Sequence, residues 1–522
     1  MEIIRDRIRT KHFVGRAVSQ TTMEDDFNVP DVKPDIEQMI EETGELKITE
    51  ARANDGKIVI RGKLEFSVLY IGSSISRPMQ KMCGSIPFEE SMNMDGVTDK
   101  DDIKVSWDME DLRTRMINSR KISVRSIVSF CVTASKTEEE EMAVDIKDGE
   151  DIYMLPKALD VSQIHSQKKD IVRIRREINV PAAKPNIMEI IWDQVMIGSL
   201  DIKVLDGRVN VRGDFDVFIM YASQEEKNPL QYFNHPLDFN ESVDCAGAAE
   251  EMIGNVEVKM IAREFNVKEN EDGELRKIEA EIVLELNMAV YEEKHIKILA
   301  DVYSNRKKLE PVMKEMIFDN ILMKNQSVIK LAQKIKIKND QAKILQICQS
   351  DASVKMDRME IMKNGIMVEG VVYAQILYIA ADDKKPVNAI KGTIPFSHMI
   401  EIDGMKPQCS FEMLPVLEQV SSTMADSEEI DIKAELYLNT IVFEQTRTEM
   451  LSDIKVSALD YEALEAMPGI VGYVVHPGDT LWKLAKQFYT TKERIMSVNR
   501  LDSETLSPRQ KLVIVKEDQS IV

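Results

Sequence analysis

The stretch Asp55-Gly-Lys-Ile-Val-Ile-Arg-Gly-Lys-Leu-Glu-Phe-Ser-Val-Leu-Tyr70 predicts the fold of most of this chain. Its Asp-Gly pair is a tight-turn signal. The apolar and polar residues that follow alternate, as they do in a strand with one buried face. Gly62 lies in the middle of this predicted strand, which indicates a β-bulge or a close approach by a neighbouring backbone.

Two further copies of the pattern follow along the chain. Residues Asp206–Tyr221 repeat it closely, and residues Asn364–Tyr378 repeat it with more substitutions; the tyrosine always lies eight positions after the glycine. Proline pairs precede the first two copies, in Pro30–Pro34 and Pro181–Pro185, but not the third. We interpret each proline pair, with the apolar run after it, as a short helix or an extended segment.

Each copy ends in a second alternating run, which completes the outline of a repeat. The runs are Lys121–Cys131, Lys277–Val290 and Glu429–Phe443. They predict three mainly β domains, each a sandwich or a curved sheet with one or two small helices. The predicted organisation is repeat domain 1 over residues 1–165, repeat domain 2 over 166–305, a divergent repeat domain 3 over 306–445, a linker over 446–472 and a terminal module over 473–516.

Several conspicuous residues of the repeats have a structural interpretation. One tyrosine closes the central strand of each copy, and we expect its ring to pack in the core with its hydroxyl bonded. These tyrosines are Tyr70, Tyr221 and Tyr378. The mid-strand glycines are expected to serve the backbone conformation alone. We interpret the acidic runs Glu24–Asp26 and Glu138–Glu141 as solvated loop charge.

The C-terminal stretch Tyr473-Val-Val-His-Pro-Gly-Asp-Thr-Leu-Trp482 predicts a different, smaller unit. Pro477–Gly478 is a turn signal that ends a strand. Apolar residues at helical spacing run through Leu481–Phe488, and Thr490–Glu493 has the spacing of a capping box that opens a second helix. Because Leu512–Val515 reads as a closing strand, the predicted order is strand, helix, helix, strand.

This stretch closely resembles the LysM module, and the resemblance runs from residue 473 to residue 515. It implies a shallow groove, between the first turn and the loop after the second helix, that grips N-acetylated glycans. The residues that match the groove are Gly478, Asp479, Thr480, Leu481, Ile495, Asn499 and Leu501. Trp482 lies beside them; its ring either contacts a sugar or a protein partner, or packs in the core. Arg509 replaces a glycine that is usual in the family, which indicates a different loop beside the groove.

The repeats resemble a domain that occurs in tandem in clostridial sporulation proteins, ahead of a terminal LysM module. Three such domains followed by LysM resemble the SipL-type spore-coat morphogenetic proteins. The resemblance implies a mother-cell protein at the forespore surface that helps to attach and encase the spore coat. It also implies that LysM docks onto the ATPase that polymerises as the basal layer of the coat.

Composition and motifs exclude several classes of function. The net charge of −22 argues against nucleic acid or an anionic membrane as the main partner, although the terminal module is basic, with seven Lys/Arg and four Asp/Glu. Five widely separated cysteines exclude a disulfide framework, and six scattered histidines form none of the usual metal-ligand motifs. Nucleotide-binding and nucleophile motifs are absent too. We therefore predict a non-enzymatic protein with no cofactor and no metal site.

The charged N-terminus and the lack of a long apolar run predict a protein that stays in the cytoplasm. Two functions remain open. The chain is either an adaptor that docks through LysM onto a protein partner, or a binder of peptidoglycan or another N-acetylglucosamine polymer. The predicted compartment favours the first function and the motif favours the second. A hydrolase targeted to such a polymer is a weaker third alternative, and self-association of the repeats is also open.

Overall fold

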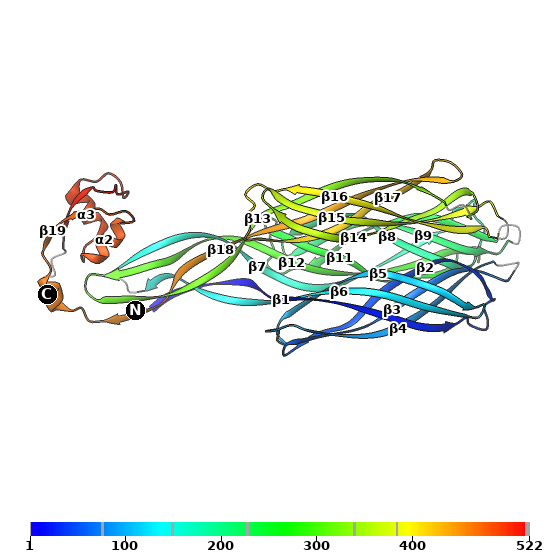
Figure 1. The fold of residues 1–522 in the computed structure, drawn as a ribbon, viewed down its shortest axis with the longest axis horizontal. Helices are drawn as coiled ribbons and strands as arrows, with labels where there is room; N and C mark the ends of the chain where they lie inside the picture. The colour runs from blue at the N-terminus through cyan, green and yellow to red at the C-terminus, as the bar shows by residue number, and fades with distance from the viewer. Residues whose placement is uncertain are drawn as a thin grey trace.

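A computed structural model describes residues 2–74, 78–147, 151–225, 229–337, 341–382 and 385–516. Figure 1 shows a thick body, a narrower stalk and a small terminal module beyond the end of the stalk. Within the described residues, each repeat contributes six strands, which form two three-stranded antiparallel sheets. The prediction of mainly β repeat domains is confirmed.

The six strands keep the same order and nearly the same lengths in every repeat. Repeat 1 contains β1 (Glu2–Asn28), β2 (Ile36–Asn54), β3 (Lys57–Gly72), β4 (Met79–Asn93), β5 (Asp102–Asn118) and β6 (Lys121–Lys147). Repeat 2 contains β7 (Ile152–Asn179), β8 (Ile187–Leu205), β9 (Arg208–Ser223), β10 (Leu230–Asp244), β11 (Ile253–Glu269) and β12 (Leu275–Ser304). Repeat 3 contains β13 (Lys308–Lys336), β14 (Ile344–Met362), β15 (Gly365–Ala380), β16 (Val387–Glu401), β17 (Cys409–Met424) and β18 (Glu429–Ser457).

The two sheets of each repeat form a sandwich. In repeat 1, β6 lies between β1 and β5, and β3 lies between β2 and β4. Buried Ile58 and Leu64 of β3 share one core with buried Val124 and Val128 of β6. Equivalent strands share a core in the other two repeats. Of the two predicted alternatives, the structure therefore has the sandwich.

The mid-strand glycines allow a close backbone approach, as predicted. A Cβ atom at Gly62 would lie 2.3 Å from the carbonyl oxygen of Lys47 and 2.9 Å from the Phe88 ring. The pairing of β2 with β3 also shifts register opposite Gly62, between Ile48 and Glu50. Gly213 and Gly370 meet the same kinds of neighbours in repeats 2 and 3. A larger residue would therefore separate the strands at these points.

The predicted packing of the strand-end tyrosines is also confirmed. The rings are fully buried, and each hydroxyl donates to a backbone carbonyl 36 residues earlier in the chain. The three bonds join Tyr70 to Pro34 at 3.3 Å, Tyr221 to Pro185 at 2.9 Å and Tyr378 to Ala342 at 3.3 Å. Repeat 3 therefore keeps the acceptor carbonyl although it lacks the proline.

The small helices expected in the repeats are wrong for the described residues, which hold no helix before residue 461. Residues 30–34 form a turn in which the Lys33 amide donates to the Pro30 carbonyl at 2.9 Å, and β2 begins directly afterwards. The guanidinium of Arg120, in the turn between β5 and β6, donates hydrogen bonds to the carbonyls of Val29, Pro30 and Lys33. Because these three backbone carbonyls are already hydrogen-bonded to Arg120, the segment satisfies them without forming a helix.

The interpretation of the two acidic runs as loops is wrong, because both lie in strands. Glu24–Asp26 belongs to β1 and Glu138–Glu141 to β6, and these two strands pair with each other. Across the pair, Glu141 contacts Arg7 at 2.9 Å and Glu139 contacts Arg9 at 3.1 Å. The acidic run is therefore compensated by basic residues of a strand more than 100 positions away.

The first and last strands of each repeat form a long ribbon that continues beyond the sandwich. The ribbons are the pairs β1–β6, β7–β12 and β13–β18, and together they make the stalk (Figure 1). Their inner faces share apolar contacts, for example among Met142, Ile298 and Met316. The predicted linker therefore starts too early, since residues 446–457 pair with β13, and the first predicted boundary at 165 falls inside β7.

At the other end of the molecule, the three repeats meet in a second shared core. Leu69, Met220 and Leu377 occupy the same position of their repeats and are all buried there, around Trp192. Asp193 of repeat 2 also lies in this region and pairs with Lys81 of repeat 1 at 3.0 Å, as well as with Arg263 of its own repeat at 2.8 Å. The repeats thus form one body and not a string of separate domains.

The terminal module has the predicted order of elements. A short helix, α1 (Tyr461–Ala466), precedes it. The module contains β19 (Ile470–Val474), α2 (Leu481–Gln487), α3 (Lys492–Asn499) and β20 (Lys511–Val515), and β19 pairs antiparallel with β20. Among the described residues, no helix is long and apolar enough to cross a membrane.

Candidate functional site

The first turn of the terminal module is fixed by hydrogen bonds among its own residues. Gly478 has a φ of 88°, which favours glycine. The Asp479 carboxylate accepts from the His476 amide at 2.7 Å and from the Tyr473 hydroxyl at 3.0 Å. The hydrogen bond from the His476 amide is the main cause that holds the pKa of Asp479 below its usual value. Thr480 caps α2 by accepting from the amide of Lys483 at 3.2 Å. Gly478 and Thr480 are therefore presented at the surface by a rigid turn.

The loop after α3 forms the other side of the predicted groove. The Asn499 side chain donates to the carbonyl of Val513 and accepts from its amide, both at 2.7 Å, so it ties α3 to β20. Leu481 and Ile495 are buried in the module core, and Leu501 packs partly against it. Five of the predicted site residues, Asp479, Leu481, Ile495, Asn499 and Leu501, thus support the fold of the module, Gly478 and Thr480 are exposed, and a binding groove at these residues stays a prediction.

Arg509 does not change the loop in the way that the sequence indicated. Its φ is 70°, the left-handed conformation that a glycine would adopt, and its amide donates to the Val475 carbonyl at 2.8 Å. A non-glycine residue in this conformation costs roughly 1 kcal/mol. The module therefore keeps the backbone turn at position 509, and Arg509 is held there in a strained conformation.

Trp482 lies on the face of α2 that meets the stalk. Its side chain is 7% exposed, and its indole N–H donates to the Asp301 carboxylate of repeat 2 at 2.8 Å. Lys486, one turn later on α2, contacts the other oxygen of Asp301 at 2.6 Å. A role for Trp482 as the contact for an outside ligand stays a prediction, because in this structure the ring is covered by the chain itself.

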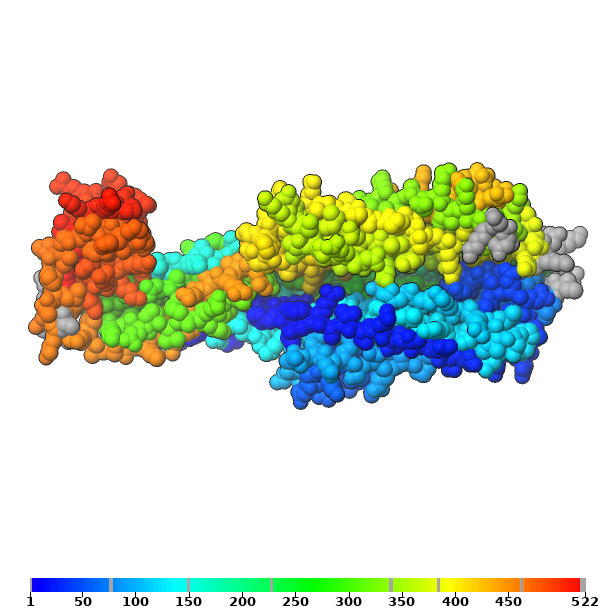
Figure 2. Space-filling view, in the orientation of Figure 1, coloured from blue at the N-terminus to red at the C-terminus, as the bar shows by residue number. Residues whose placement is uncertain are grey.

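Two tyrosines of the second ribbon complete this contact. The rings of Tyr153 and Tyr303 stack with centroids 4.8 Å apart, and Tyr303 meets the Trp482 ring edge-on at 4.8 Å. The Tyr303 hydroxyl also donates to the Thr490 carbonyl between α2 and α3, at 3.0 Å. Figure 2 shows the module against the end of the stalk. Sequence reasoning missed Asp301, Tyr153 and Tyr303 as contact residues.

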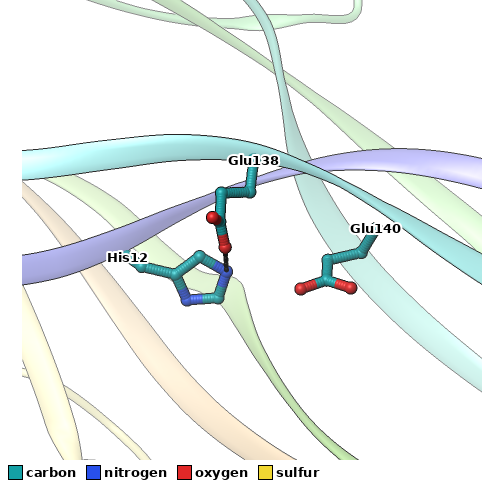
Figure 3. Close-up of side chains that lie close together, drawn as sticks. All are labelled: His12, Glu138 and Glu140. Atoms are coloured by element: carbon teal, nitrogen blue, oxygen red, sulfur yellow. Dashed lines mark ion pairs between the residues drawn. The ribbon is translucent and has the colours of Figure 1, made fainter. Parts of the chain in front are cut away.

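One cluster of potential metal ligands lies within the described residues, on the first ribbon. His12, Glu138 and Glu140 place one ligand atom each within 4.8 Å of the others (Figure 3). Glu140 is already paired with Lys314 at 2.9 Å, and Glu138 with Lys136. A cation would have to displace both ammonium groups. The cluster therefore reads as part of the network of ion pairs on the stalk.

Two carboxylates, buried Glu41 and partly buried Asp351, lie where repeat 1 meets repeat 3. Burial, and then the neighbouring charge of Asp351, raise the pKa of Glu41 to about 8. Burial likewise raises the pKa of Asp351 to about 6. Lys391 and Gln375 face Glu41 from β16 and β15, and Lys391 pairs with the adjacent Glu42 at 2.7 Å. Since the Glu41 side chain is buried, its shifted pKa bears on stability.

Comparison with family models identifies two kinds of domain. Residues 35–117, 186–268 and 343–425 match the model described as the SipL, SPOCS domain, and residues 473–515 match the LysM domain. Each SPOCS match spans the four inner strands of a repeat and leaves the ribbon strands outside. Neither a curated protein nor a solved structure matches the chain.

Proposed function

The chain carries three SPOCS domains of the SipL type and a C-terminal LysM domain, and from this order we propose that it is a non-enzymatic adaptor in spore-coat assembly. Both are binding or structural domains, and the SPOCS repeats associate the chain with spore-coat morphogenesis. The finer proposal is that LysM docks onto the morphogenetic ATPase of the coat's basal layer, in the mother cell at the forespore surface. The domain order is the observation that carries it.

The shape of the molecule supports an adaptor. The three repeats share one core at the wide end, and LysM lies at the far tip of the stalk (Figure 1). A binding domain at the tip of a long body reaches a partner while the body remains available to other coat components. Gly478, Thr480 and Arg500 are exposed on LysM, at and next to the residues that match the family's groove. We propose that this surface contacts the partner.

A pair of pull-downs from lysate of sporulating cells tests the adaptor. The full chain is compared with a chain that ends at Met467 and lacks LysM, and bound proteins are identified by mass spectrometry. We expect the truncated chain to lose one dominant partner, the basal-layer ATPase. Retention of that partner by the truncated chain would overturn docking through LysM.

Two charge reversals locate the contact within LysM. Arg500→Glu changes the exposed groove loop, and Arg494→Glu makes the same change in the first turn of α3. Only Arg500→Glu should weaken capture of the partner. Equal loss with both variants would mean that net charge, and not the groove, governs binding.

Peptidoglycan binding is the second candidate, because the LysM domain implies it. Sedimentation of the full chain with purified peptidoglycan distinguishes the two functions. Sedimentation that depends on LysM, together with no protein partner lost on truncation, would replace the adaptor by a glycan binder.

A further inference from the structure

We propose that the tip of the second ribbon is a docking seat for the LysM domain of the same chain, which holds LysM in a fixed position on the stalk. The seat consists of Asp301, Tyr303 and Tyr153. This inference concerns the chain alone and holds whichever partner LysM binds.

The contact combines two polar bonds to one carboxylate with a cluster of aromatic rings. Asp301 accepts from the Trp482 indole and from the Lys486 ammonium through different oxygens. Tyr303 is 4% exposed and belongs to the same apolar cluster as the LysM core. A buried aromatic cluster with bonded polar atoms has the character of a specific interface rather than a chance encounter.

Comparison with the other two ribbons shows that the seat is special to repeat 2. All three ribbons carry an aspartate after an unpaired bulge residue near the tip, in the sequences Val144-Asp145, Ala300-Asp301 and Ser452-Asp453. In each, the aspartate accepts from the amide of the next residue, at 2.8 to 2.9 Å. The aspartate is therefore common to all three ribbons, and it cannot by itself determine which ribbon LysM contacts.

The cross-strand pair beside the aspartate does differ. Ribbon 1 has Glu2 opposite Lys147, as an ion pair at 3.4 Å, and ribbon 3 has Glu310 opposite Lys455. Ribbon 2 has Tyr153 opposite Tyr303 at this position. The ionic pair suits a solvated tip, whereas two tyrosines suit a tip that another surface covers. The substitution occurs only in the ribbon that contacts Trp482, which indicates a built docking site.

The double substitution Tyr153→Glu/Tyr303→Lys tests the seat and should leave the pairing of the two ribbon strands intact. It installs the pair that ribbon 1 already carries at the same position, so the strands should still pair. The matched control Glu2→Lys/Lys147→Glu exchanges the charges at the tip of ribbon 1. Circular dichroism and thermal unfolding confirm that both variants fold.

The readout is zero-length carbodiimide cross-linking of the full chain, followed by mass spectrometry. The Lys486 Nζ and Asp301 Oδ1 atoms are 2.6 Å apart. The reagent should therefore join the two side chains by an amide bond within one monomer, in both the native chain and the control. We expect its yield to fall about tenfold in the Tyr153→Glu/Tyr303→Lys variant, since the aromatic contacts are lost. An unchanged yield in that variant would overturn the role of the tyrosines. Absence of the cross-link from the native monomer, or its formation only between two chains, would overturn the seat.

Discussion

The two ends of this molecule are built from the same repeat but hold their contacts in different ways. At the wide end, equivalent residues of all three repeats close around Trp192, and Asp193 of repeat 2 pairs with Lys81 of repeat 1. At the narrow end, one ribbon of the three contacts LysM through a few rings and one carboxylate. The comparison shows that a core shared by three repeats holds the body together, whereas the position of LysM depends on a few residues of one ribbon.

Burial of Asp193 shows how firmly the wide end is held. Burial opposes its ionisation, but the charges of Lys81 and Arg263 outweigh this and hold the pKa of Asp193 below its usual value. Removing one partner of a buried charge leaves the other uncompensated, which is strongly destabilising. At the narrow end the Asp301 side chain is similarly accessible and pairs with one ammonium group, that of Lys486, at 2.6 Å.

The largest expected effect is at the wide end. Trp192→Ala removes a large side chain that is 2% exposed, so we expect the free energy of unfolding of the body to fall by about 3–5 kcal/mol. Denaturant unfolding followed by circular dichroism measures it. A loss below about 1 kcal/mol would mean that the repeats do not depend on their shared core, and the comparison of the two ends would fail.

The next effect tests the buried carboxylates of the wide end. The pKa of Glu41 is raised from 4.5 to about 8, so the folded chain keeps a proton that the unfolded chain loses above pH 4.5. Stability is therefore highest below the unfolded pKa and falls as the pH rises towards 8. Glu41→Gln removes this dependence and should stabilise the chain by about 3 kcal/mol at pH 7, with little effect near pH 4.5.

Unfolding of Glu41→Gln is measured at pH 4.5 and pH 7, with Glu37→Gln as the control. Glu37 lies exposed on the same strand, so its substitution should change stability little at either pH. A gain for Glu41→Gln that is equal at both pH values would show that Glu41 does not titrate in this range.

The local features of the repeats could be predicted from the sequence because their causes are local. Gly62 and Tyr70 lie at fixed positions of one strand, and the repeat shows that strand three times. The strand pairing in the ribbons could not be predicted from the sequence, because Glu138–Glu141 pairs with residues of β1 that lie far away along the chain. The acidic run looked like a loop since its compensating arginines were not adjacent in sequence.

The docking seat escaped prediction for a related reason. Asp301 and Trp482 are 181 residues apart, and nothing in either local sequence points to the other. The signal that existed was comparative: aligning the repeats places the pair Tyr153 and Tyr303 where the other copies have a glutamate and a lysine. The fold of LysM, in contrast, follows from a short motif, and the motif residues Asp479 and Asn499 make hydrogen bonds that hold its turn and its strands.

A tryptophan substitution at the narrow end gives the direct contrast with Trp192. Trp482→Phe keeps a ring in the LysM core but removes the N–H that donates to Asp301. We expect the unfolding of the body to change by less than about 0.5 kcal/mol. Glutamyl endopeptidase should cleave faster at exposed Glu462 and Glu465, which precede LysM, because the released module moves more freely. Unchanged cleavage would show that the indole bond does not hold the module.

The smallest effect sharpens the comparison within LysM itself. Arg509 has a φ of 70°, and Arg509→Gly relieves that strain while preserving the amide that donates to Val475. Because glycine also has more freedom in the unfolded chain, we expect a net gain of about 0.5 kcal/mol in the stability of the module. Native-state hydrogen exchange of the β19 and β20 amides measures this without unfolding the body. Arg509→Ala is the matched control: it removes the same side chain but keeps the strained φ, so it should give no gain. If both variants slow exchange equally, the arginine side chain and not the backbone is what weakens the module.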